Sequence, residues 1–158
     1  SDVKLLLVSF LVINGWGFQD IILQYNLAEP ETIGYLARLD KLRVIELLPH
    51  NRIKLMVSPR FSWRKDGPIQ NFFTANLQAD FLKSRFDQEG EFFSFLSGML
   101  SARSMGYIKQ KLEHLAVEFN EHNQTDRYLP LQQRIGYSLF LAMRPWRADI
   151  FDSLRKLR

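Results

Sequence analysis

The residues best suited to chemistry in this sequence are six basic residues of the kind that contact nucleic-acid phosphates: Arg38, Lys41, Arg43, Arg52, Lys54 and Arg60. They belong to residues 34–66, which carry eight basic and three acidic side chains and therefore a net charge of +5. The whole chain of 158 residues carries +4. A local basic excess is expected of a surface that contacts phosphate. A solvated surface with poorly mixed charges is the alternative interpretation.

Patterns for catalysis or metal binding are weak. The chain has no cysteine, which excludes disulfides, thiolate zinc sites and cysteine nucleophiles. It also has no GxSxG turn and no glycine-rich phosphate loop. His114 and Glu118 have a spacing that can hold a metal, but further ligands are missing, so a surface histidine is favoured. Asp87, Glu89 and Glu91 are expected to be solvated in a loop. We expect no enzyme activity, no catalytic residue, no metal and no cofactor.

Phenylalanine is frequent, with 13 residues in the chain. Seven of these residues could line an effector pocket, although a core or a dimer interface is favoured: Phe72, Phe73, Phe81, Phe92, Phe93, Phe95 and Phe119. Neighbouring side chains on a strand face opposite sides. One member of the pair Phe92 and Phe93 therefore needs a second covered surface, which favours a sheet covered on both faces or an oligomer.

The basic residues must be positioned by the elements of the first half of the chain. Apolar spacing predicts three helices, the third with Pro30 in its first turn, and turn residues at 49–51 predict a hairpin. The expected elements are helices over 3–13, 18–25 and 29–42 and strands over 45–48 and 52–57. The inner stripe of the third helix is predicted to be Ile33, Leu36, Leu39 and Leu42. Three helices followed by a hairpin is the order of a winged helix-turn-helix, here spanning 2–58.

A connector over 59–68 is expected to lead to a second domain over 69–158. Its expected elements are helices over 69–82, 101–121 and 146–154 and strands over 92–100 and 135–143. Ser101 is the predicted N-cap of the middle helix, and residues 122–126 are the predicted loop after it. The predicted fold class is α+β, a winged helix-turn-helix followed by a small α-β-α-β-α unit.

Several segments resemble the C-terminal part of a group of proteobacterial Xre/Cro-type helix-turn-helix regulators. These segments are LLLVSFLVINGW, YLARLDKLRVIELLPHNRIKL, FSWRKDGPIQNFF, LSARSMGYIKQKLEHLAVEF and LAMRPW. The resemblance covers nearly all of 2–150 and carries no catalytic residue. It implies a DNA-binding transcriptional regulator whose principal DNA-reading domain precedes this region. The chain begins at Ser1-Asp2 without methionine, and we expect it to be a fragment of such a protein.

The third helix would be the recognition helix of the predicted winged helix, with its first residues nearest the bases. Its expected outward face is Glu31, Gly34, Ala37, Arg38 and Lys41. Arg38 and Lys41 could contact phosphate, whereas Gly34 and Ala37 offer little with which to read bases. Glu29 and Glu31 would repel phosphate at the leading end of the helix. Arg52 and Lys54 follow the expected hairpin tip at His50-Asn51, where they suit contact with the DNA backbone or the minor groove.

These observations predict a C-terminal fragment of a cytoplasmic, homodimeric transcriptional regulator, which serves oligomerisation and adds DNA backbone contact through the wing. The alternative is an effector-sensing or protein-interaction module with no DNA contact of its own; any effector is unknown. We expect no membrane contact, because the longest apolar run begins at Leu5, breaks at Asn14 and is shorter than the roughly 18 residues of a membrane span.

Overall fold

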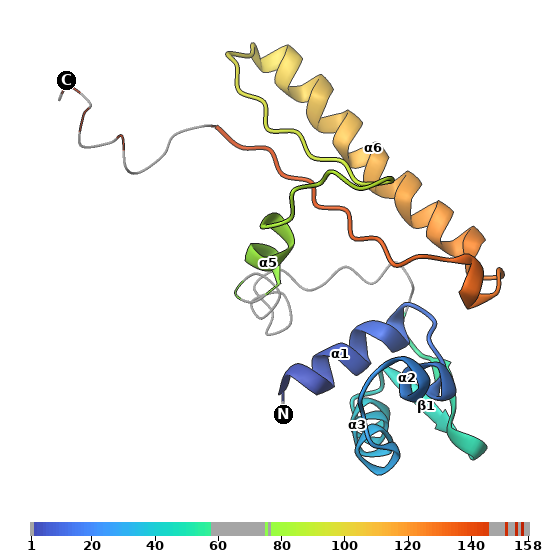
Figure 1. The fold of residues 1–158 in the computed structure, drawn as a ribbon. Coiled ribbons are helices and arrows are strands. Elements are labelled where there is room, and N and C mark those ends of the chain that lie inside the picture. Colours follow the sequence, from blue (N-terminus) through green and yellow to red (C-terminus); the bar gives the residue numbers. More distant parts are fainter. Residues whose placement is uncertain are drawn as a thin grey trace. The chain divides into compact units, whose positions relative to one another are not determined.

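The structure is a computed structural model that describes residues 2–57, residues 77–145 and the single residues 75, 151, 154 and 156 (Figure 1). The chain divides into two units, Ser1–Ser62 with Phe119–Ile135 and Trp63–Glu118 with Gly136–Arg158. The described residues form helices and one two-stranded antiparallel sheet, so the α+β class is confirmed at that level. The predicted connector over 59–68, which includes Arg60, lies outside the described residues.

The first helix, α1, spans Asp2–Ile13 and ends where the sequence predicts. The amide of Trp16 donates to the carbonyl of Leu11 at 3.0 Å, and the amide of Gly15 donates to that of Val12 at 3.0 Å. This pair of bonds is a Schellman cap, which requires a left-handed residue after the helix. Gly15 takes that conformation with φ 86°, at no steric cost.

The next two helices, α2 over Phe18–Gln24 and α3 over Glu29–Lys41, are joined by a short turn. The carboxylate of Asp20 accepts a hydrogen bond from the amide of Gly17 at 3.1 Å, which closes the start of α2. Pro30 lies in the first turn of α3, where its missing N–H has no intrahelical acceptor to lose. The sequence therefore predicts both helix starts to within a few residues.

The end of α3 has the same Schellman cap as α1, but the left-handed position is occupied by arginine instead of glycine. The amide of Val44 donates to the carbonyl of Leu39 at 3.0 Å, and the amide of Arg43 donates to that of Asp40 at 2.9 Å. Arg43 takes the left-handed position with φ 57°. A side chain in this conformation costs roughly 1 kcal/mol that glycine avoids.

A β-hairpin follows directly, made of β1 over Ile45–Leu48 and β2 over Arg52–Leu55. The strands are antiparallel, with Ile45 opposite Leu55 and Leu48 opposite Arg52. The short 3-10 turn η1, over Pro49–Asn51, connects them, and His50 and Asn51 both have positive φ. The predicted hairpin and its turn are therefore confirmed, with the second strand ending two residues earlier than predicted.

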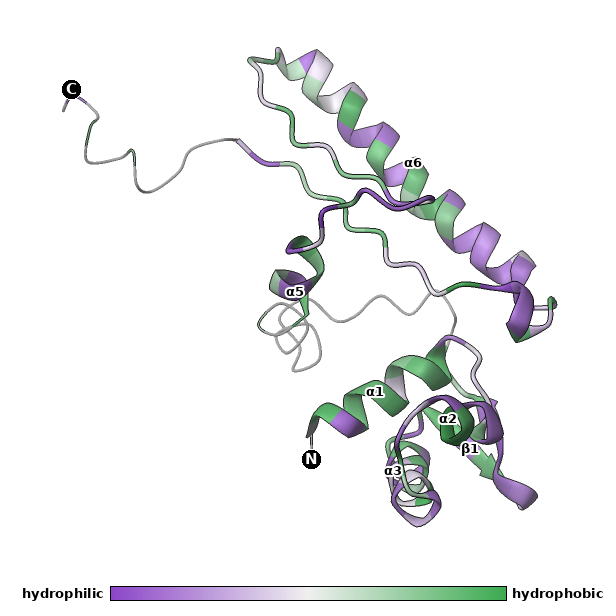
Figure 2. Ribbon diagram, in the orientation of Figure 1, coloured by the Kyte–Doolittle hydropathy of each residue, from purple (hydrophilic) through white to green (hydrophobic). Residues whose placement is uncertain are grey.

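The three helices and the hairpin share one hydrophobic core. Side chains of α1, α2, α3 and β1 meet in it, and Figure 2 shows hydrophobic residues along α1 and α2 against polar residues at the hairpin tip. Its buried members are Val8, Leu11, Val12, Phe18, Ile21, Leu27, Tyr35, Leu36, Leu39 and Ile45. Burying a side chain such as Leu36, which is fully enclosed, contributes about 1.5–3 kcal/mol.

The second half of the chain contains a short helix, α5 over Gln78–Leu82, and a long one, α6 over Ala102–Asp126. The hydroxyl of Ser101 accepts a hydrogen bond from the amide of Ser104 at 3.1 Å, so Ser101 caps α6 as predicted. The loop predicted over 122–126 is wrong, because α6 continues through it. No glycine or proline interrupts the chain between Gly106 and Pro130. The next described element after α6 is a 3-10 turn, η2, over Leu131–Gln133.

The two strands predicted over 92–100 and 135–143 do not form within the described residues. Both segments lie between the ends of helices and turns, but neither is assigned to a strand, and the described part of the chain contains no ladder besides β1 with β2. The α-β-α-β-α order is therefore incorrect for these residues in one chain, because an extended segment becomes a strand only when another backbone pairs with it. The helix predicted over 69–82 is described only at its end, and the one over 146–154 lies almost entirely outside the described residues.

A small group of aromatic side chains surrounds the end of α5. The rings of Phe81 and Phe86 meet edge to face at 5.6 Å, and those of Phe86 and Phe93 stack at 5.1 Å. These contacts hold the residues after α5 against the start of the segment over 92–100. Among the helices of the described residues, none has both the length and the apolar character that a bilayer span requires.

The two helix caps predict opposite effects of substitution at equivalent positions. We expect Arg43→Gly to raise the free energy of unfolding by up to about 1 kcal/mol, because it relieves the left-handed side chain, and Gly15→Ala to lower it by about 1 kcal/mol. Urea unfolding of both variants measures this. A loss of stability in Arg43→Gly as large as that in Gly15→Ala would contradict the cap assignment.

Candidate nucleic-acid interface

The exposed face of α3 carries two of the predicted basic residues. Pro30, Gly34, Arg38 and Lys41 are exposed, and they follow one another at helical spacing. The side of α3 that faces the core is formed by Thr32, Tyr35, Leu36 and Leu39. The predicted inner stripe is confirmed at Leu36 and Leu39, and Ile33 is half-buried and packs against the core. The prediction is wrong at Leu42, which is 67% exposed.

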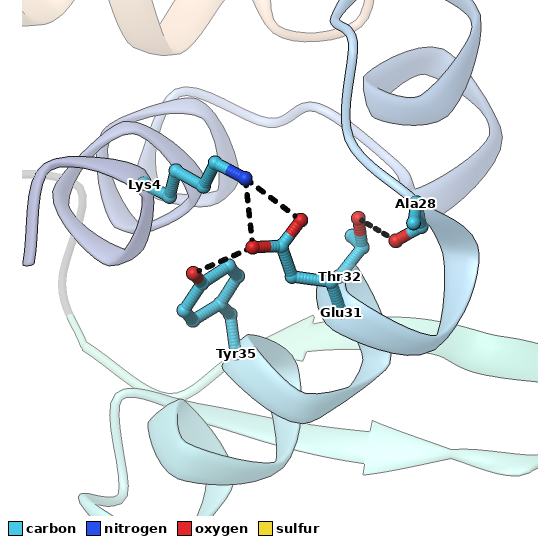
Figure 3. Close-up of polar contacts among 5 residues, drawn as sticks. All are labelled: Lys4, Ala28, Glu31, Thr32 and Tyr35. Carbon is cyan, nitrogen blue, oxygen red and sulfur yellow. Dashed lines mark hydrogen bonds and ion pairs between the residues drawn. The ribbon is translucent and has the colours of Figure 1, made fainter. Parts of the chain in front are cut away.

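The acidic start of α3 differs most from the expectation. Glu31 is expected from the sequence to face outward and repel phosphate, but its carboxylate lies beside the ammonium group of Lys4 from α1, at 2.8 and 3.0 Å (Figure 3). The hydroxyl of Tyr35 donates to the same carboxylate at 3.1 Å. Glu31 is therefore neutralised within the protein, and only Glu29 remains as an exposed acid in the first turn.

The electrostatics of this group follow from its contacts. The hydrogen bond from Lys4 holds the pKa of Glu31 below its ordinary value, against the opposing effect of desolvation. The same bond raises the pKa of Lys4. Burial, together with the bond to Glu31, raises the pKa of Tyr35, whose side chain is 8% exposed. The three groups therefore stay in the charge states Lys⁺, Glu⁻ and neutral tyrosine around pH 7.

A buried hydroxyl lies beside this ion pair. Thr32 is fully enclosed, and its hydroxyl donates to the carbonyl of Ala28 at 3.0 Å (Figure 3). The bond satisfies a polar group that would otherwise cost about 1–3 kcal/mol to bury. The bond closes the start of α3, and the Lys4–Glu31 bridge ties the same turn to α1.

The hairpin presents the other two described basic residues of interest. Arg52 and Lys54 are exposed on β2, and they alternate with Ile53 and Leu55, which are half-buried and pack against the core. Because alternate residues of a strand share a face, the two basic side chains project from the same side of the hairpin.

Each of the two basic side chains of the hairpin makes one contact with a neighbouring residue. The ammonium of Lys54 lies 3.7 Å from the carboxylate of Glu46, its cross-strand neighbour. Nε of Arg52 donates to the carbonyl of Pro49 at 3.4 Å, close to the limit for a hydrogen bond. Both basic side chains are exposed, and exposed ion pairs are worth roughly 1 kcal/mol or less. A phosphate could therefore displace Glu46 from Lys54 at little cost.

Two candidate DNA-binding residues remain, Arg43 and Arg60. Arg43 is exposed just after α3, where it joins α3 to β1, at the opposite end of the hairpin from Arg52. Arg60 lies outside the described residues. The structure therefore groups the described candidates into two pairs, Arg38 with Lys41 and Arg52 with Lys54, with Arg43 between α3 and the hairpin in the chain.

Three residues that position α3 and the hairpin were not singled out from the sequence. Lys4 is 27 residues from Glu31 in sequence, and nothing local to either residue signals the pairing. Tyr35 follows Glu31 by four residues, which is a spacing that brings side chains together on a helix, so this contact is predictable. The third is Asp40, whose carboxylate accepts a hydrogen bond from the amide of Leu47 in β1 at 3.0 Å.

The other titratable groups of the sequence analysis do not converge. Asp87 lies 3.8 Å from Arg85, and the carboxylate of Glu91 accepts a hydrogen bond from the amide of Gln88 at 3.0 Å. Both acids therefore serve their own loop. Across the part of the chain that the structure describes, no three histidine or acidic side chains are grouped as a metal site would require.

Comparison with protein-family models, with curated proteins and with solved structures found no match in any of the three. The candidate interface therefore rests on the residues and contacts described above.

The Lys4–Glu31 pair predicts a specific dependence of stability on pH. Because its folded-state pKa is lowered, Glu31 stabilises the fold above its ordinary pKa of about 4.5, and this contribution is lost as the pH falls through the folded-state value. Lys4, whose pKa is raised, contributes below its ordinary value and loses that contribution as the pH rises through the raised value.

Urea unfolding between pH 7 and acid conditions tests this, with Glu31→Gln against Glu46→Gln as a control. Glu46 is an exposed carboxylate with a longer ion pair of 3.7 Å. We expect Glu31→Gln to be less stable than the native chain at pH 7 and to lose less stability in acid. Equal acid dependence of the native chain and Glu31→Gln would contradict the assigned role.

Proposed function

We propose that this chain is the oligomerising, C-terminal part of a bacterial DNA-binding transcriptional regulator, with residues 2–58 as a winged helix-turn-helix that contacts the DNA backbone. A separate helix-turn-helix domain, implied by the resemblance to Xre/Cro-type regulators, reads the operator bases. Such a protein acts in the cytoplasm as a homodimer, so that its two reading domains match two half-sites about one DNA turn apart.

The observation that carries the proposal is the arrangement of the exposed basic pairs. In a winged helix-turn-helix, the second helix of the motif and the hairpin are the elements that approach DNA. Here those elements correspond to α3, with Arg38 and Lys41, and the hairpin, with Arg52 and Lys54. The Lys4–Glu31 bridge supports the same interpretation, because it neutralises one of the two carboxylates that would repel phosphate.

The side chains of α3 favour backbone contact over base reading. Gly34 is exposed on its outward face and Ala37 is half-buried, and neither carries a donor or acceptor for a base edge. Contacts from arginine and lysine to phosphate position a protein on DNA but carry no sequence information. This winged helix would therefore strengthen binding of the whole regulator at any site, and the operator choice would lie elsewhere.

Because the outward face of α3 lacks side chains that could read bases, a second candidate is also supported. This candidate is a protein-interaction or effector-sensing module with no DNA contact of its own. An exposed helix face with Gly34 and Ala37 suits close packing against another protein surface better than base reading. The two candidates differ in one measurable respect, because only DNA contact makes affinity for a duplex fall with salt.

Binding of the chain to a short mixed-sequence duplex, followed by fluorescence anisotropy between about 50 and 200 mM salt, separates the two candidates. We expect Arg52→Ala with Lys54→Ala to weaken binding for all sequences. The slope of log affinity against log salt should also become shallower, by about 0.9 for each phosphate that the variant no longer neutralises. The interaction module predicts no salt-dependent binding by the native chain.

The matched control removes the same charge elsewhere. Arg85→Ala with Lys109→Ala takes away two exposed basic side chains that pair with Asp87 and Glu113 outside the winged helix. We expect this variant to keep the native salt slope. An equal weakening in both double variants would mean that net charge alone drives binding, and it would contradict contact through the wing.

The pairing role has its own test. One chain has a mass of 18.6 kDa. Light scattering after gel filtration is expected to give twice this mass over the concentration range used for DNA binding. A strict monomer at high concentration would overturn the oligomerising role, whatever the outcome of the DNA experiment.

A further inference from the structure

The segment over 92–100 is an extended chain whose backbone has no described partner. Among the described residues, no backbone hydrogen bond joins Phe92–Leu100 to any other segment. Its large apolar side chains are exposed: Phe92 and Phe95 at 83%, Leu96 at 87% and Met99 at 88%. Open amide and carbonyl groups beside exposed apolar side chains form an edge that another strand can pair with.

The exposed apolar area of this segment is a substantial share of what a stable dimer buries. Phe93 and Leu100 add further exposed side chains, at 56% and 53%. At about 150–250 Å² for each aromatic residue, the three phenylalanines of the segment alone contribute on the order of several hundred Å² of exposed apolar surface. A standard protein interface buries about 800 Å² on each partner. Monomeric proteins rarely leave a patch of this size exposed.

The sequence of the segment matches its own reverse in side-chain size at three of the four positions on each side of Leu96. Counted outward from Leu96, small residues lie two positions away on each side, Ser94 and Gly98, and large apolar residues lie three and four positions away. Those large residues are Phe92 and Phe93 before Leu96 and Met99 and Leu100 after it. A strand that pairs antiparallel with its own copy about Leu96 therefore matches side-chain size at positions two, three and four from the axis, whereas Phe95 lies opposite the smaller Ser97 of the second copy.

Charge favours the same arrangement. Glu89 and Glu91 precede the segment and Arg103 follows it, so antiparallel pairing brings the acids of one copy toward the arginine of the other. The segment over 135–143 is flanked by Arg134 and Arg144, and pairing it with its own copy would place like charges together. Like charges opposite each other destabilise a sheet. The first segment, rather than the second, therefore suits the two-fold axis.

We propose that residues 92–100 pair antiparallel with the same residues of a second copy of this chain, with Leu96 at the two-fold axis. This inference rests on the dimer of the proposed function and specifies its surface and register. It places Phe93 opposite the second copy's Met99 and Ser94 opposite the second copy's Gly98. Phe92 and Phe93 then lie on opposite faces of the new strand pair.

Engineered thiols test this register, because the chain has no cysteine of its own. In the proposed pairing, the two copies of residue 96 lie directly opposite, about 4.5–5.5 Å apart at Cα, which suits a disulfide. The two copies of residue 94 are separated by four residues along the strand, or roughly 13 Å, which does not. We expect Leu96→Cys to form a covalent dimer on oxidation and Ser94→Cys to remain uncrosslinked.

A second variant guards against loss of the dimer when Leu96 is replaced. Ser94→Cys with Gly98→Cys keeps Leu96 and places a thiol of each copy opposite one of the other, so we expect crosslinking in the double variant and little in either single variant. Non-reducing gel electrophoresis reads the crosslink, and light scattering of the reduced samples reads the mass.

The outcomes separate the inference from the proposed function. A native chain that is dimeric, with no crosslink in either Leu96→Cys or the double variant, overturns this pairing and leaves the dimer intact. Equal crosslinking in Leu96→Cys and Ser94→Cys also overturns it, because random collision would explain both. A monomeric native chain overturns the inference and the dimer together. Position-specific crosslinking in a dimeric chain supports both.

Discussion

Burial of one side of α3 is the constraint on which the N-terminal unit depends. Leu36 and Leu39 pack with Ile21 of α2 and Ile45 of β1 in a single core, and removing a leucine of this kind costs about 2–5 kcal/mol. Once that side is committed to the core, the opposite side of α3 has no freedom of orientation. Arg38 and Lys41 are exposed because Leu36 and Leu39 are buried. The position of the basic residues on the surface of α3 therefore follows from the packing of its opposite side.

The ion pair between Lys4 and Glu31 shows how packing can reverse an electrostatic expectation. A carboxylate in the first turn of a helix is favoured by the helix dipole, yet the same carboxylate would oppose an approaching phosphate. In the structure, Glu31 still interacts favourably with the helix dipole, but its repulsion of phosphate is reduced because Lys4 of α1 neutralises its carboxylate. Helix stability and surface charge are thus adjusted by different residues.

The local parts of the fold were predictable from the sequence, and the non-local parts were not. Gly15 and Pro30 mark helix boundaries through their own backbone preferences, so the boundaries near them were correct. The contact of Lys4 with Glu31 depends on how α1 crosses α3, which no local pattern encodes. The phase of α3 was slightly wrong because Thr32 and Tyr35 are buried through hydrogen bonds that a hydrophobicity pattern ignores. The strands predicted over 92–100 and 135–143 do not form in the described residues, because the partner that a strand needs cannot be read from its own sequence.

The bond from the amide of Leu47 to the carboxylate of Asp40 has a consequence for how copies of the chain meet. A two-stranded hairpin has two open edges, and each could recruit a foreign strand. By occupying a donor in β1 with a side chain of α3, the protein blunts the edge of its only described sheet. Growth of β1 into a shared sheet with a neighbour, and from there into a fibre, is discouraged at that point. Of the two edges of the hairpin, the one on β1 is therefore partly closed by a side chain of the same unit.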